Sequence, residues 1–237
     1  MRKNFLKAAF ALLVSVPFLT SCFDNDVDPT GYGDAYLMVK IVGQDTLYGL
    51  GLHAFSYSDF SAVTAAASSA PTNTYTLQAY MGYKQDFIWL TPENQYSEEL
   101  PVTGDYTFNA TFATGESLVL ADKLYTDRVY PPALTTCQYS NTSHKVEVKW
   151  TKPANADVYI IRMFDSDGDL LFVSPSYNSS TDNYSFGKDS QGWQTTTFPS
   201  EGTTCTVEVT AYRMKTPSAY SNVQCAAKSR QNITWGN

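Results

Sequence analysis

Few residues of this 237-residue chain could do chemistry, and they do not form a known catalytic pattern. The two histidines, His53 and His144, belong to no H-E-x-x-H zinc pair, and no serine lies in a G-x-S-x-G nucleophile elbow. A Ser-His-Asp site or a pair of carboxylates could still assemble from distant positions, which keeps a hydrolase as the less favoured alternative. We predict that the chain is not an enzyme and needs no cofactor.

A glycine-rich hexapeptide, Gly49-Leu50-Gly51-Leu52-His53-Ala54, has the spacing of a dinucleotide-binding fingerprint. That fingerprint requires a helix after the turn, so that backbone amides at the helix N-terminus meet the pyrophosphate. No helical periodicity follows here, and aromatic residues take its place. We predict a strand or turn that contains glycine.

Three carboxylates surround Gly168 and resemble half of a calcium loop: Asp165, Asp167 and Asp169. A complete loop needs a bidentate glutamate further along, and Leu170 instead begins an apolar run. The Asp-Gly pair between two apolar runs is typical of a hairpin turn. We therefore predict a solvated turn, with calcium as the alternative, and no other metal site.

Four aromatic residues fall outside clear strand alternation, and they are Trp193, Trp235, Tyr177 and Tyr184. Flat rings beside amide side chains suit stacking on sugars, and polar loops at the end of a sandwich are common binding surfaces. These rings are our candidate ligand-binding residues. The alternative is that they cap the hydrophobic core.

Three cysteines, Cys137, Cys205 and Cys225, lie on the apolar faces of predicted strands. Because three is odd, at most one intrachain disulfide can form. At least one is expected to be a buried free thiol, and the sequence does not decide the rest.

Composition narrows the fold and the partners. The chain is 43% hydrophobic and holds 17 tyrosines, and Tyr and Thr favour β-structure. Removing Arg2, Lys3 and Lys7 of the leader from the 16 basic residues leaves 13 against 23 acidic residues. The resulting net charge near −10 argues against nucleic acid as a partner.

The first 21 residues form a signal peptide, with a basic start and a short apolar run that ends before Pro17. The segment Leu19-Thr20-Ser21-Cys22 resembles the bacterial lipobox, which implies lipid on Cys22 and a stable membrane anchor through two or more acyl chains. Residues 22–33 are polar and contain proline and glycine, as a flexible tether does. The acids Asp24, Asp26 and Asp28 resemble the export signal of Bacteroidetes surface lipoproteins, which implies the outer membrane and exposure at the cell surface.

Within residues 127–237, the segment from Trp150 to Tyr159 is followed by the Asp-Gly hairpin, and the segment from Thr206 to Tyr212 is followed by Ser218 to Val223. These segments resemble strands B and C and strands F and G of a fibronectin type III domain. Lys145 to Trp150 alternates charged and apolar residues, which places Val146, Val148 and Trp150 on a buried face. The resemblance implies a seven-stranded sandwich used for spacing and adhesion.

Residues 34–126 also alternate in places, most clearly from Gly104 to Phe112, where Tyr106, Phe108, Ala110 and Phe112 share one face. This part resembles the Ig-like domains of Bacteroidetes surface lipoproteins. The Ala- and Ser-rich segment 61–70 is expected to be a surface loop.

The sequence therefore predicts an all-β protein with two tandem antiparallel β-sandwich domains behind a lipidated tether. The expected role is non-catalytic recognition or adhesion at the outer surface, with a glycan or a protein as ligand. A structural spacer, or a subunit of an outer-membrane surface complex, is the main alternative.

Overall fold

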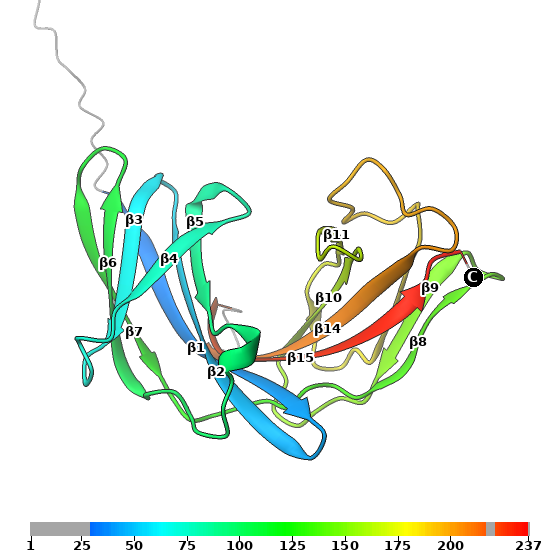
Figure 1. The fold of residues 1–237 in the computed structure, drawn as a ribbon, viewed down its shortest axis with the longest axis horizontal. Helices are drawn as coiled ribbons and strands as arrows, with labels where there is room; N and C mark the ends of the chain where they lie inside the picture. The colour runs from blue at the N-terminus through cyan, green and yellow to red at the C-terminus, as the bar shows by residue number, and fades with distance from the viewer. Residues whose placement is uncertain (1–28, 217–220, 237) are drawn as a thin grey trace, which may run out of the picture.

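The structure is a computed structural model that describes residues 29–216 and 221–236. The predicted signal peptide, Cys22 and the acidic start of the predicted tether lie outside the described residues. The described part contains fifteen β-strands and no α-helix, with a single 3-10 turn at Glu93–Gln95 (Figure 1). The predicted all-β fold class is therefore confirmed. No helix in this part of the chain is long and apolar enough to cross a membrane.

The first lobe consists of the first seven strands of the described residues. They are β1 (Gly31–Val42), β2 (Asp45–Ser56), β3 (Phe60–Ala67), β4 (Tyr75–Tyr80), β5 (Tyr83–Leu90), β6 (Gly104–Phe112) and β7 (Ser117–Leu124). The predicted alternation in β6 is confirmed, since Tyr106, Phe108, Ala110 and Phe112 are each no more than 1% exposed. Strand β4 pairs with β3 through residues 75–77 and with β5 through residues 78–80, and so connects the two layers of this lobe.

Strand β3 corrects one expectation, because the Ala- and Ser-rich segment is not a surface loop. Val63, Ala65 and Ala67 alternate into the core and are at most 4% exposed. The segment pairs with β4 on one side and with β6 on the other. Small side chains are accommodated there because the large rings of the neighbouring β6 fill the interior.

The second lobe consists of the remaining strands. They are β8 (Leu134–Ser140), β9 (Lys145–Trp150), β10 (Val158–Phe164), β11 (Leu170–Val173), β12 (Tyr177–Asn178), β13 (Asn183–Phe186), β14 (Thr204–Thr216) and β15 (Ser221–Thr234). Strands β13, β9 and β8 form a separate three-stranded sheet. That sheet packs on β10 and β11, where Trp150 contacts Tyr159 at 5.3 Å and Phe172 stacks on Phe186 at 4.1 Å between ring centroids. The predicted burial of Val146, Val148 and Trp150 is confirmed.

One continuous sheet runs through both lobes, in the order β11-β10-β14-β15-β1-β2-β5-β4-β3-β6-β7. The lobes meet where β1 pairs with β15, with Leu37 opposite Cys225 and Val39 opposite Ala227. This pair is parallel, whereas the other strand pairs of the described residues are antiparallel. In Figure 1 the lobes stand on either side of these bridging strands.

Buried polar contacts reinforce the junction. The ammonium group of Lys215 on β14 lies 2.9 Å from Asp34 on β1 and also pairs with Asp122 on β7. All three side chains are at most 10% exposed. Gln224 on β15 donates to the carbonyl oxygens of Tyr125 and Asp127 at 2.9 Å, which fixes the segment that connects the lobes.

Candidate ligand-binding groove

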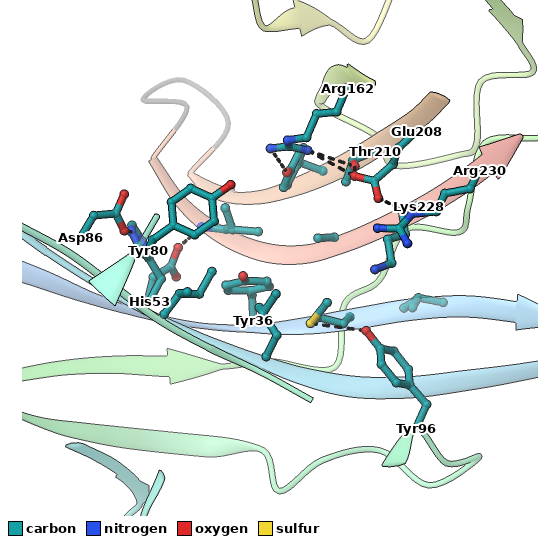
Figure 2. Close-up of a pocket in the computed structure, with 18 of the residues that line it drawn as sticks. Tyr36, His53, Tyr80, Asp86, Tyr96, Arg162, Glu208, Thr210, Lys228 and Arg230 are labelled. Carbon is teal, nitrogen blue, oxygen red and sulfur yellow. Dashed lines mark hydrogen bonds and ion pairs between the residues drawn. The ribbon is translucent and has the colours of Figure 1, made fainter. Parts of the chain in front are cut away.

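A groove of about 350 Å³ lies between the lobes, on one face of the shared sheet. Because side chains alternate along each strand, the strand register selects which of them share this face. Asp34 and Tyr36 of β1 lie opposite His53 and Gly51 of β2. In the second lobe, the corresponding rows are Tyr212, Thr210 and Glu208 of β14 opposite Ala226, Lys228 and Arg230 of β15. Figure 2 shows the two walls, with Arg162 and Glu208 on one side and Tyr80 and Asp86 on the other.

Glycines of β2 make room for the rings of the groove floor. A Cβ atom on Gly51 would lie 2.3 Å from Cε2 and Cζ of Tyr36, so this ring lies directly against the backbone of β2. A Cβ atom on Gly49 would lie 2.9 Å from Cε1 of Tyr96, which follows the 3-10 turn. The ammonium group of Lys40 sits 4.1 Å from the centroid of the Tyr96 ring. The glycine-rich hexapeptide is thus part of a strand, as predicted, and its glycines shape the groove.

A tight hairpin brings a further tyrosine to the mouth of the groove. Met81 and Gly82 both have positive φ values, 51° and 82°, and Tyr80 pairs with Tyr83 across them. Two central residues with positive φ define the type I′ turn, which suits the twist of a two-stranded hairpin. Tyr80 itself is 39% exposed and points into the groove in Figure 2.

Burial affects three of the phenols of the groove. It raises the pKa of Tyr36, Tyr80 and Tyr96 above the usual value of 10.0. A protonated phenol offers an O–H donor, an acceptor oxygen and a flat ring at once. The floor can therefore contact both the apolar and the polar parts of a ligand.

A network of charged and polar groups forms the wall of the second lobe. Glu208, only 5% exposed, lies 3.5 Å from Arg162 and accepts a hydrogen bond of 2.8 Å from Nε of Arg230. Arg162 donates to the hydroxyl groups of Thr210 at 3.3 Å and Tyr212 at 3.1 Å. Burial by itself lowers the pKa of Arg162, but Tyr212 and Glu208 outweigh it and the pKa is raised, so the guanidinium stays charged.

Two further pairs of polar side chains lie in the groove or at its edge. Nε2 of His53 lies 2.8 Å from Oδ1 of Asp86, and Lys228 lies 3.1 Å from Glu93 at the edge. The residues that line the groove include no serine or cysteine that could act as a nucleophile beside His53. The arrangement presents fixed donors and acceptors, which is what binding requires.

The structure corrects the expectation for Trp235. This residue is 2% exposed, so its ring has no face free for a sugar. The final strand extends to Thr234, and Trp235 continues the ladder by donating to the carbonyl oxygen of Thr203 at 2.8 Å. The ring then packs on Tyr139, with 5.1 Å between centroids.

The other three predicted aromatic residues are brought together, but they are partly buried against the core. Trp193 contacts the Trp235 ring at 5.6 Å and donates from Nε1 to the carbonyl oxygen of Gly187 at 3.0 Å. Tyr177 and Tyr184 lie 5.0 Å apart. None of the four predicted residues lines the groove, and ligand binding by Trp193, Tyr177 or Tyr184 stays a prediction.

The three carboxylates around Gly168 lie in the β10–β11 turn. Asp165 accepts hydrogen bonds from the backbone N–H groups of Asp167 at 2.9 Å and Asp169 at 2.8 Å. This oxygen is therefore used to hold the hairpin itself. Among residues 29–216 and 221–236, no group of three or more His, Cys, Asp or Glu side chains is placed to hold a metal ion.

The remaining candidates lie apart from the groove. Cys137, Cys205 and Cys225 are buried free thiols, and burial raises the pKa of Cys137 to about 11 and that of Cys225 to about 12. His144 is exposed, with a positive φ of 54°, in the β8–β9 turn. Sequence analysis missed the groove residues, although the alternating glycines of β2 were a usable signal.

Comparisons with known proteins add little about function. No protein-family model and no curated protein matches the chain. Among solved structures, a cytokine receptor complex matches at 12% identity over 79% of this chain and 92% of its own, with a TM-score of 0.34. A two-domain fibronectin type III segment from chicken tenascin matches at 12% identity over 84% and 98%, with a TM-score of 0.29. A tetra-tandem repeat of a large adhesion protein matches at 18% identity over 86% and 49%, with a TM-score of 0.29. At such scores these likenesses carry no argument about a ligand.

Proposed function

We propose that this chain is a non-catalytic recognition protein whose ligand occupies the groove between the lobes. The observation that carries the proposal is the concentration of tyrosines and fixed polar groups on one face of a sheet shared by both lobes. Ligand sites are concave, largely preformed and often located between domains, with a few polar groups that set orientation. The parallel β1–β15 pair and the buried Lys215 contacts support a preformed groove, because they hold the two walls in one arrangement.

The experiment that tests this proposal blocks the groove without disturbing the core. Ala226 lines the groove at the centre of β15, so Ala226→Trp would fill it with an indole ring. Val119, 65% exposed on β7, provides the control Val119→Trp outside the groove. The immobilised chain is incubated with cell-surface extract, and the bound material is quantified and analysed for chemical change.

We expect the wild type and Val119→Trp to retain the same material, unchanged, and Ala226→Trp to lose it. Equal retention by all three proteins would contradict the groove as the site. Conversion of the bound material into a product would contradict a non-catalytic role.

We also propose that the chain is a surface lipoprotein of the Bacteroidetes type, anchored to the outer membrane through lipid on Cys22. The lipobox-like segment and the acidic tether of the sequence support this proposal. Cys22→Ala should move the protein from the detergent phase to the aqueous phase in a partitioning assay. Unchanged partitioning of Cys22→Ala would contradict the lipid anchor.

A further inference from the structure

We propose that the occupant of the groove is a neutral saccharide, an inference that rests on the groove being the ligand site. It follows from the charge balance, the donors left accessible, the tyrosine rings and the paired strand edges of this face. The charge balance argues against charged ligands and the paired edges argue against extended peptides, whereas the donors and the rings suit a sugar.

The formal charges of the residues that line the groove cancel, because three are acidic and three are basic: Asp34, Asp86 and Glu208 against Arg162, Lys228 and Arg230. Glu208 lies between Arg162 and Arg230, and Asp86 contacts His53. An anionic ligand that reached the two guanidinium groups would lie close to the Glu208 carboxylate. A cationic ligand would meet the same difficulty with the two arginines. Like charges at short range are costly where solvent is partly excluded, so the groove favours a ligand without net charge.

Hydrogen-bonding capacity nevertheless remains in the groove. A guanidinium carries five N–H donors, and the bond from Arg230 to Glu208 uses the one on Nε. The Arg230 side chain is 47% exposed, and its guanidinium carbon lies 5.4 Å from the centroid of the Phe164 ring. Asp86 is bonded to His53 through Oδ1 and is 31% exposed. These groups can donate to and accept from the hydroxyl groups of a sugar.

The tyrosines supply the surface on which a sugar ring would stack. Tyr36 has one side against Gly51, and Figure 2 shows it in the floor between Tyr80 and Tyr96. The C–H faces of a pyranose are apolar and its hydroxyl groups point outward, so a flat ring bordered by donors and acceptors satisfies both. The volume of about 350 Å³ is at the small end of the range of about 300–1,000 Å³ for small-molecule sites, which suits a short saccharide.

An extended peptide fits this face less well. Peptides often bind by adding a strand to a free sheet edge, where main-chain hydrogen bonds provide the affinity. In the groove, β14, β15, β1, β2 and β5 are each paired on both sides, so the groove floor offers side chains and no open backbone edge. Recognition there must work through side chains alone, as it does for sugars.

The test measures binding of the whole expressed chain to neutral oligosaccharides, with acidic oligosaccharides such as galacturonan and heparin fragments alongside. We expect saturable binding of at least one neutral oligosaccharide, with an affinity that is unchanged between about 50 mM and about 500 mM salt. Tyr80→Ala, at an exposed turn, and Tyr36→Ala should each weaken binding roughly tenfold. The control Tyr57→Ala changes a tyrosine directly after the end of β2 that is 82% exposed and does not line the groove. It should bind as the wild type does.

Three outcomes would overturn the saccharide proposal. They are a lack of binding to every neutral oligosaccharide, binding restricted to acidic ones with a strong salt dependence, and binding that survives in both folded tyrosine variants. If surface material is still lost in Ala226→Trp while no saccharide binds, the groove remains the site and the saccharide proposal is wrong. Retention by Ala226→Trp would instead reject the groove itself.

Discussion

At the residue scale, the groove depends on the absence of a side chain at Gly51. Gly51 lies in β2 directly opposite Tyr36, and the ring of that tyrosine occupies the space where a side chain would be. Glycine weakens a strand interior because it loses more backbone entropy on folding than other residues. The Tyr36 ring explains why a glycine is found here, because the ring needs the space beside Gly51 and covers the backbone of β2.

This explanation predicts a strong coupling between the two positions. Gly51→Ala should destabilise the protein by about 1–3 kcal/mol, since the new methyl group would overlap the Tyr36 ring. In a Tyr36→Ala background the same change should be neutral or stabilising, because the overlap is gone and a strand glycine has been removed. Urea unfolding of the four proteins measures the coupling energy. Equal destabilisation in both backgrounds would show that the ring is not the reason for the glycine.

At the scale of elements, the junction of the lobes contains a charged cluster that should make stability depend on pH. Burial raises the pKa of Asp34 from 3.8 to about 6, although Lys215 acts in the opposite direction. The folded state therefore holds the proton more tightly than the unfolded chain does. The stabilisation that results is complete below about pH 3.8 and is lost as the pH rises through about 6.

We therefore expect this group to add about 1 kcal/mol to the free energy of unfolding on going from pH 7 to pH 5. Asp34→Asn should abolish that increment, whereas Asp45→Asn, at the exposed start of β2, should keep it. Chemical denaturation at the two pH values gives the comparison. An identical pH dependence in the wild type and Asp34→Asn would contradict the role of the cluster.

The strands also show how much of the fold could be predicted from the sequence. Strands such as β6 and β9 were predictable because period-two alternation is a local pattern. Strand β3 was missed because alanine has a low β-propensity, and here its burial depends on rings contributed by other strands. Trp235 was misplaced for a similar reason, since its partner Thr203 is distant in sequence.

The parallel pairing of β1 with β15 had no local signal at all. Leu37 and Cys225 are brought together by the fold, and no turn or periodicity connects them. Because this pair joins the lobes, the groove between them had only one local signal in the sequence, the alternating glycines of β2. Its walls could be anticipated only as polar residues on the solvent side of strands, which is an ordinary pattern.

At the scale of the whole molecule, two sandwich-like lobes on one sheet form a preformed concave surface. The first lobe supplies the aromatic floor, and the second supplies the arginine and glutamate wall. A site divided in this way requires both lobes at once, which explains the buried contacts of Gln224 and Lys215 at the junction. At the end of the second lobe, Trp193 packs edge-on against the buried Trp235.

The central claim, that the ligand binds between the lobes, is tested most directly by hydroxyl-radical footprinting of the whole chain with and without bound ligand. Mass spectrometry then reads the oxidation of individual tyrosines and tryptophans. The groove account predicts that the ligand protects Tyr80 and Tyr36, while the oxidation of Tyr57 and Trp193 stays the same. Protection of Trp193, Tyr177 and Tyr184, with no change at Tyr80, would contradict it and move the site to the end of the second lobe.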